Sequence, residues 1–129
     1  MGAALAHLHR APEYPWTIAN LAQEVGVSRS VLAERFRQYL GKPPMAYLSR
    51  WRLQLGARLL TSTSYSVARI SGDVGYESEP AFNRAFKREF GTPPARFRIQ
   101  AKSAKKVVPV GVRPNRYETT IAHQIARAR

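Results

Sequence analysis

Apolar residues recur at every third or fourth position through most of the chain, which is the period of helices that bury one face. The pattern is clearest in residues 29–40 and 79–90, where bulky side chains stand four positions apart. They are Leu32, Phe36 and Leu40 in the first segment and Phe82, Phe86 and Phe90 in the second. Both segments are therefore predicted to be helices with these residues in the core.

Short polar residues and glycines mark the ends of the predicted helices. Ser28 and Ser78 stand directly before the two segments, where a serine hydroxyl caps the first turn. A shorter helical segment precedes each of them, after the caps Thr17 and Ser66. A glycine follows every one of the four segments, at Gly26, Gly41, Gly75 and Gly91. Two helices joined by a short turn around a glycine form the helix-turn-helix pattern.

The second helix-turn-helix repeats the first at an almost constant distance. Residues 17–26 recur as residues 66–75 at an offset of 49, and residues 28–44 recur as residues 78–94 at an offset of 50. One residue is added in the turn, and both copies end in the motif Gly-x-Pro-Pro. Agreement across caps, turn and apolar stripe predicts one scaffold used twice.

Two further helices are expected, over residues 2–11 and 44–60, and Trp16 and Trp51 are expected in the core. We therefore predict an all-α fold, with two homeodomain-like helix-turn-helix subdomains joined by a long linker helix. The expected limits are residues 1–43 for the first subdomain, 44–61 for the linker helix, 62–98 for the second subdomain and 99–129 for a basic tail.

The charge of the chain favours a polyanionic partner. There are 21 Lys and Arg residues against 8 Asp and Glu, which gives a net charge of +13. Residues 1–98 hold 14 basic and 7 acidic residues, and residues 99–129 hold 7 and 1. The repeated region is therefore basic without the tail, and nucleic acid is the first candidate partner. Within the tail, residues 117–129 are a possible helix.

The sequence lacks the residues that several classes of function require. The absence of cysteine excludes disulfides, thiol chemistry and cysteine zinc sites, and it fits a reducing cytoplasm. No apolar run approaches the roughly 18–20 residues of a membrane span. The histidines, His7, His9 and His123, have no carboxylates grouped with them, and no phosphate loop or nucleophile–base arrangement is visible. We predict no catalytic residue, metal or cofactor, and no enzymatic activity.

From residue 17 to residue 98 the chain resembles the DNA-binding domain of the AraC/XylS family of transcription regulators. The resemblance rests on Gly75, Tyr76, Ser78, Phe82, Arg84, Phe86, Lys87, Gly91, Pro93 and Pro94, together with their counterparts in the first repeat. It implies sequence-specific binding of double-stranded DNA, with the helices at 29–40 and 79–90 in successive major grooves. Ser71 and Gly72 depart from the family pattern, which favours alanine-like residues there, so we expect a looser helix.

The resemblance also implies which residues meet DNA. On the first recognition helix the expected base contacts come from Arg29, Ser30, Ala33 and Glu34. On the second, Glu79 can also face DNA, and the expected base contacts come from Pro80, Ala81, Asn83 and Arg84. Arginine suits guanine and glutamate suits the amino group of cytosine. Phosphate contacts are expected from Arg37, Lys42, Lys87 and Arg88. Alternatively, Glu34 pairs with a neighbouring arginine, and Lys87 and Arg88 form a solvated face.

The same resemblance also implies partners and a location for the protein. It implies RNA polymerase as a partner, a cytoplasmic protein associated with the nucleoid, and no membrane. Full-length members usually carry a separate effector or dimerisation domain. We therefore expect this chain to be a piece of a longer regulator, and the alternative is a stand-alone short regulator. The alternatives are a DNA-binding fragment of a recombinase or transposase, or a nonspecific basic nucleic-acid-binding protein. The operator, the effector and the choice between activation and repression stay open.

Overall fold

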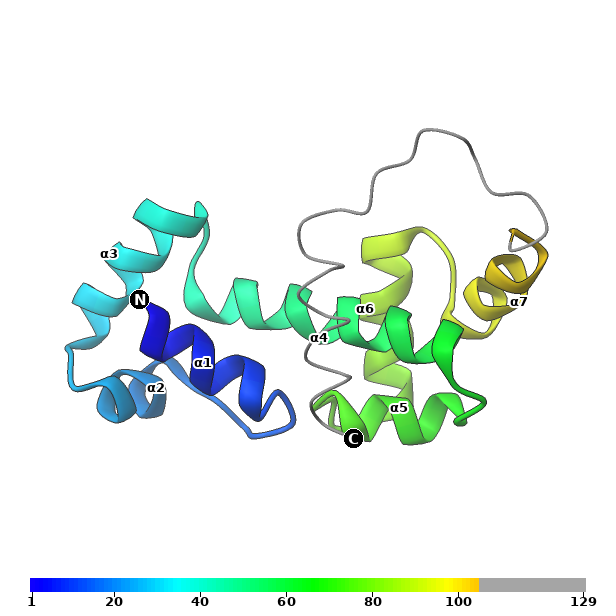
Figure 1. The fold of residues 1–129 in the computed structure, drawn as a ribbon, viewed down its shortest axis with the longest axis horizontal. Coiled ribbons are helices and arrows are strands. Elements are labelled where there is room, and N and C mark those ends of the chain that lie inside the picture. The colour runs from blue at the N-terminus through cyan, green and yellow to red at the C-terminus, as the bar shows by residue number, and fades with distance from the viewer. Residues whose placement is uncertain (105–129) are drawn as a thin grey trace. The chain divides into compact units, whose positions relative to one another are not determined.

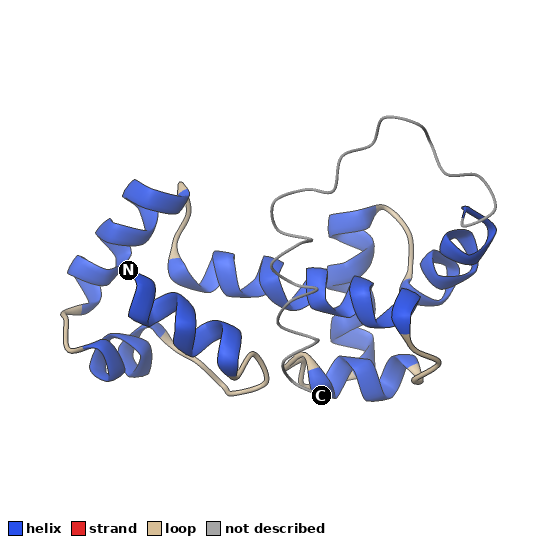
Figure 2. Cartoon of the chain, viewed as in Figure 1, coloured by secondary structure: helices blue, strands red, loops and turns tan. Residues whose placement is uncertain are grey.

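The computed structural model describes residues 1–104, and every element in that part of the chain is a helix (Figure 1, Figure 2). This confirms the prediction of an all-α fold. None of the described helices is both long and apolar enough to cross a membrane. The helices are α1 (Gly2–Arg10), α2 (Ile18–Val25), α3 (Arg29–Leu40), α4 (Pro44–Ser62), α5 (Val67–Asp73), α6 (Glu79–Phe90) and α7 (Pro94–Ala104).

The chain divides into two compact units, and the division falls inside α4. The first unit is Met1–Arg52 and the second begins at Leu53. The linker helix thus belongs half to each unit, because α4 continues through the division without a break. In the second unit α7 runs through residue 98 to Ala104, so a helix crosses the expected start of the tail. The possible helix at residues 117–129 lies outside the described residues.

Side-chain caps begin the helices where the sequence predicts them. The Thr17 hydroxyl oxygen accepts from the Asn20 N–H at 3.1 Å, and the Asn20 side-chain oxygen accepts from the Thr17 N–H at 2.8 Å. The backbone N–H groups of both residues at the start of α2 are thus hydrogen-bonded. Ser28, Ser66 and Ser78 cap α3, α5 and α6 in the same way, each accepting the N–H three residues on. These caps explain why the predicted starts agree with the observed ones.

Left-handed glycines end α2, α3 and α6. Gly26, Gly41 and Gly91 have φ of 73°, 72° and 78°, a conformation that side chains with a Cβ rarely adopt. Helix α5 ends differently, because its last residue is Asp73 and right-handed Val74 precedes Gly75 at φ 103°. It is one residue shorter than α2.

Ser71 is buried in α5, and its hydroxyl group is hydrogen-bonded. Its side chain is 1% exposed, and its Oγ donates to the Val67 carbonyl at 2.7 Å. A serine that bonds back to the carbonyl four residues earlier is accommodated in a helix at a small cost in stability. The departure from the family pattern is therefore absorbed locally.

The predicted apolar stripes are buried at their centres and half-buried at their ends. Leu32, Phe36, Phe82 and Phe86 are at most 2% exposed, as expected. Leu40 and Phe90 are only half-buried, because they stand in the last turn of α3 and α6. Trp51 is buried, but Trp16 is half-buried, with its indole N–H donating to the Ala11 carbonyl at 2.8 Å.

His9 joins α1 to α4 within the first unit. Its ring stacks on Trp51 with centroids 4.1 Å apart, and its Nε2 lies 2.7 Å from the Tyr47 hydroxyl. Burial lowers the pKa of His9 below its ordinary value. His7, two residues earlier, instead meets the edge of Trp16. The two histidines therefore face different neighbours.

The second half of α4 carries two buried positions that align in sequence with two of α1. At an offset of 52, buried Ala4 and Leu8 correspond to buried Gly56 and Leu60. A Cβ on Gly56 would lie 2.7 Å from the Phe82 ring, so the glycine is what lets this ring approach the helix. The first unit has the smaller Leu32 at the position of Phe82, and it has alanine at the position of glycine.

We predict that Gly56→Ala destabilises the second unit by about 1–2 kcal/mol. Overpacking against Phe82 costs about 1–3 kcal/mol, and the better helix propensity of alanine offsets up to about 1 kcal/mol of it. Adding Phe82→Leu should recover most of the loss, because the smaller side chain leaves room for the added Cβ. Urea unfolding measures both changes. Gly72→Ala is the control, since nothing lies within 4 Å of that Cβ; equal effects at Gly56 and Gly72 would contradict the close approach.

We predict that acid destabilises the first unit through His9. The unfolded state binds the His9 proton near pH 6.5, whereas the folded state binds it only at lower pH, so the stability present above pH 6.5 falls as pH drops through the folded pKa. The slope reaches about 1.4 kcal/mol per pH unit between the two values. Denaturant unfolding at several pH values measures the effect, and His9→Gln should flatten it. An NMR titration that places the His9 pKa at or above 6.5 would overturn the prediction.

Candidate nucleic-acid interface

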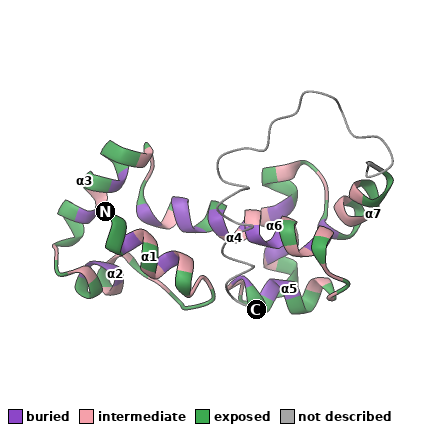
Figure 3. Ribbon diagram, viewed as in Figure 1, coloured by how far each residue is buried: buried purple, intermediate pink, exposed green. Residues whose placement is uncertain are grey.

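Burial of one stripe sets which face of each recognition helix meets solvent. In α3 the inward residues are Leu32 and Phe36, and in α6 they are Phe82 and Phe86. The second unit reinforces this with an aromatic cluster, in which the Phe86 ring lies 4.4 Å from Phe90 and 5.1 Å from Phe97 between centroids. Because both helices are anchored through their middle turns, their remaining faces are held outward (Figure 3).

The outer face of α3 carries the residues expected to contact bases. Four of its members are exposed and Ala33 is half-buried; the exposed ones are Arg29, Ser30, Glu34 and Arg37. Within residues 1–104 none of these side chains has a hydrogen bond or ion pair. In particular, the Glu34 carboxylate is not paired with an arginine in that part of the chain. These polar groups are therefore available to a ligand.

The outer face of α6 is similar, but two of its residues in the first half of the helix are half-buried. Pro80, Arg84, Lys87 and Arg88 are exposed, whereas Ala81 and Asn83 are half-buried. Ser78 Oγ accepts the backbone N–H of Ala81, so this N–H is not available to a ligand. The Arg84, Lys87 and Arg88 side chains have no hydrogen bond or ion pair among the described residues. Lys42 is half-buried in the turn after α3, away from both outer faces in sequence. The DNA contacts assigned to all these residues stay predictions.

Two arginines that the sequence left without a role hold the loops leading into the helix-turn-helix units. In the first unit Arg52 of α4 donates from Nε to the Pro12 carbonyl and from Nη2 to the Tyr14 carbonyl, both at 2.8 Å. These acceptors belong to the first lead-in loop, residues 11–16, which connects α1 to the Thr17 cap. The guanidinium group thus fixes the path by which the chain enters α2.

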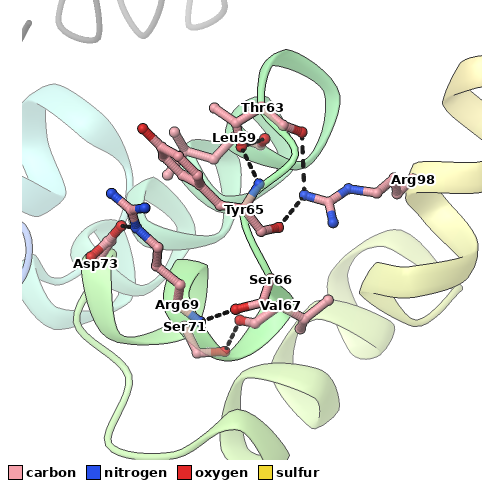
Figure 4. A network of polar contacts seen from close by, with 9 residues as sticks. All are labelled: Leu59, Thr63, Tyr65, Ser66, Val67, Arg69, Ser71, Asp73 and Arg98. Atoms are coloured by element: carbon pink, nitrogen blue, oxygen red, sulfur yellow. Dashed lines mark hydrogen bonds and ion pairs between the residues drawn. The ribbon is translucent and has the colours of Figure 1, made fainter.

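In the second unit Arg98 of α7 does the same for the second lead-in loop, residues 63–65 (Figure 4). It donates to the carbonyls of Leu60 at 3.0 Å, Thr63 at 3.4 Å and Tyr65 at 2.6 Å. The planar guanidinium suits several carbonyls at once, which a lysine ammonium does not match. The loop that precedes the Ser66 cap is therefore tied to the last described helix.

The two arginines are not at equivalent positions of the repeat. At an offset of 50, Arg98 corresponds to Leu48, one helical turn before Arg52. The first lead-in loop is three residues longer than the second. The longer loop is thus held by the arginine that stands one turn later. No sequence motif marks such carbonyl acceptors, which is why the alignment of the repeats did not reveal this pairing.

Arg69 of α5 also has partners on the protein surface. The Arg69 guanidinium lies 3.6 Å from the centroid of the Tyr65 ring, and its Nε is 3.5 Å from Asp73 Oδ2. Both charged side chains are about half-exposed, so the ion pair adds little stability. The spacing of four residues between successive members was a visible signal that Arg69 has local partners.

Metal chemistry has no site among residues 1–104, where no three His, Cys, Asp or Glu side chains gather suitably. The described residues form two helix-turn-helix units. The recognition helix of each unit presents basic side chains that have no hydrogen bond or ion pair in this part of the chain.

A family model described as a helix-turn-helix domain matches residues 21–100. A putative AraC-like transcription regulator of Streptomyces lividans is 47% identical over 98 residues, which is 76% of this chain and 32% of that protein. The chain belongs to the AraC/XylS family of transcription regulators. It spans about a third of the length of the curated relatives it matches.

Solved structures agree with this membership of the AraC/XylS family. An AraC-type regulator from Chromobacterium violaceum superposes with a TM-score of 0.72 at 33% identity, covering 78% of this chain and 89% of that one. The DNA-binding domain of AdpA, a global transcriptional factor solved in complex with a target DNA, superposes with a TM-score of 0.78 at 26% identity. That match covers 83% of this chain and 96% of the AdpA domain.

We predict that Arg98→Met lowers the stability of the second unit by about 1.5–3 kcal/mol, the usual worth of hydrogen bonds to a charged group. Arg98→Lys should recover only part of the loss, because it keeps the charge without the planar fork. Urea unfolding measures the change. Arg96→Met, at an exposed position of the same helix, is the matched control. Equal stability of the Arg96 and Arg98 variants would contradict the role of Arg98.

Proposed function

We propose that the chain binds double-stranded DNA sequence-specifically and regulates transcription, with α3 and α6 as its recognition helices. The observation that carries the proposal is the same in both units. The second helix of each helix-turn-helix is anchored by buried residues at its centre, and it presents unpaired polar side chains on the opposite face. In helix-turn-helix proteins this helix lies in the major groove and contacts base edges.

Family membership supports the same proposal. The AdpA domain that this chain resembles was solved with its target DNA, and related chains are named as transcription regulators. The 19 residues of α4 extend over about 28 Å at about 1.5 Å per residue. This length is of the order of the roughly 34 Å groove repeat, which favours contacts in successive major grooves. A single chain then contacts two dissimilar blocks of an asymmetric site.

Specificity and affinity come from different residues in this proposal. Arg29, Glu34 and Arg84 extend far enough to contact base edges, with help from the smaller Ser30, Ala33, Pro80, Ala81 and Asn83. Arg37, Lys42, Lys87 and Arg88 contribute phosphate contacts that depend on salt. In the full-length protein we also expect contact with RNA polymerase, a separate effector or dimerisation domain, and a location in the cytoplasm at the nucleoid.

The test is to select binding sites from a random duplex pool with the 129-residue chain and then to measure variants on the selected site. Arg84→Ala should weaken binding to that site by about 1–3 kcal/mol and relax the preference at one base position, leaving random DNA nearly unaffected. Lys87→Ala should weaken binding on all sequences and reduce the slope of log affinity against log salt by about one unit.

Arg58→Ala serves as the control, because Arg58 is exposed on α4 outside both recognition helices. Equal losses at Arg58, Lys87 and Arg84 on selected and random DNA would leave only a nonspecific effect of net charge. Failure to enrich any sequence from the pool would count directly against sequence-specific binding.

A further inference from the structure

The outer faces of α3 and α6 carry opposite charges at two corresponding positions. At the offset of 50 that relates the helices, Arg29 corresponds to Glu79 in the first position of the helix. At the sixth position Glu34 corresponds to Arg84. Helix α3 therefore begins with a donor and continues with an acceptor, whereas α6 begins with an acceptor and continues with a donor.

We propose that Glu79 is a base-contacting residue and that the two recognition helices select DNA blocks of inverted hydrogen-bonding polarity. The proposal rests on the DNA-binding function above and adds its specificity. An arginine matches the two acceptors of guanine, and a glutamate matches the amino group of cytosine. Taken from the first turn of each helix, α3 then prefers guanine followed by cytosine, and α6 prefers cytosine followed by guanine.

The structure leaves all four charged groups without a partner in the described part of the chain. Arg29, Glu34, Glu79 and Arg84 are each exposed, and none has a hydrogen bond or ion pair within residues 1–104. The capping of α6 is done by Ser78, so Glu79 is not needed to satisfy the first turn. These side chains therefore stabilise no observed local contact.

Helix electrostatics explains one member of the inversion but not the pair. An acid in the first turn of a helix is stabilised by the macrodipole, and Glu79 has that position in α6. Arg29 stands at the same position of α3, where a positive charge is unfavourable. A local stability requirement would place acids at both positions. The reversal at the first position, accompanied by the opposite reversal at the sixth, points to a ligand.

The spacing of the charges suits base pairs that lie about two steps apart. Five residues along a helix span about 7.5 Å, or about two base-pair steps of roughly 3.4 Å each. Rotation of about 100° per residue places the two charges about 140° apart around the helix axis. Glu34 and Arg84 lie opposite the buried stripe, whereas Arg29 and Glu79 are in line with it but stand in the exposed first turn. The residues between them are small or compact, namely Ser30 and Ala33 in α3 and Pro80 and Asn83 in α6. The long charged side chains can therefore extend past them toward base edges, one from the first turn and one from the outer face of each helix.

A charge exchange within one helix tests the inference. Site selection is repeated with Arg29→Glu combined with Glu34→Arg, which gives α3 the polarity of α6 without changing the net charge. We expect the block contacted by α3 to exchange its guanine and cytosine preferences, with about 5- to 150-fold discrimination at each position. The block contacted by α6 should stay unchanged. Loss of the preference without inversion, or no change at all, would overturn the inference.

A milder variant and a control keep the test independent of folding. Glu79→Gln should lose the cytosine preference at one position of the α6 block by a similar factor, whereas uniformly tighter binding to all sequences would mean that Glu79 only repels phosphate. The control exchanges Arg10 and Glu13, which are exposed in the first unit outside α3, and it should leave both blocks as they are. Far-UV circular dichroism verifies the folding of each variant.

The outcomes also separate the inference from the proposed function. If the unaltered chain enriches no sequence, sequence-specific binding fails and the inference with it. If it enriches two blocks that neither the charge exchange nor Glu79→Gln affects, sequence-specific binding stands and only the inverted polarity is wrong.

Discussion

Burial of the apolar stripe in each recognition helix is the constraint on which the candidate interface depends. Phe36, Phe82 and Phe86 are fully buried, and each large side chain contributes a few kcal/mol to stability relative to a smaller one. Rotating either helix about its axis would expose these rings. The same burial that stabilises the units therefore also determines which polar side chains face outward, and packing and recognition are two results of one periodicity.

The two units meet this constraint with different residues. The second unit pairs the larger Phe82 with Gly56, while the first unit has Leu32 and Ala4 at the positions that align with them in sequence. Close packing tolerates such exchanges when the total volume is kept. The two lead-in loops show a similar adjustment. They differ in length, and the arginines that hold them differ in position by one helical turn. The repeat thus conserves contacts of the same kind rather than identical residues.

Much of the fold was predictable because its signals are local. Caps such as Ser28, turn glycines such as Gly41 and the four-residue apolar spacing each act within one or two turns, and they gave the helix limits closely. The carbonyl acceptors of Arg52 and Arg98 were not predictable, because they lie more than 30 residues away in sequence and leave no side-chain motif. Leu40 was expected in the core because its spacing fits the apolar stripe. The end of the helix leaves it half-buried, which the spacing does not show.

The candidate interface was predictable to a similar depth. Periodicity and the family resemblance indicated the outward residues, and the structure places most of them in solvent. Ala33, Ala81 and Asn83 are half-buried, which the pattern of a single segment did not reveal. Exposure by itself identifies no ligand, so the DNA contacts remain proposals with stated tests.

Helix α4 has a thermodynamic consequence because it is shared by both units. Hydrogen bonds between successive turns run without a break across the division at residues 52 and 53. Helices lose their turns cooperatively, so unwinding that starts in one half tends to extend into the other. Each unit is therefore the neighbour that limits fraying of the other's helix. Folding of the two halves of the chain is linked through the backbone itself, whatever each half binds.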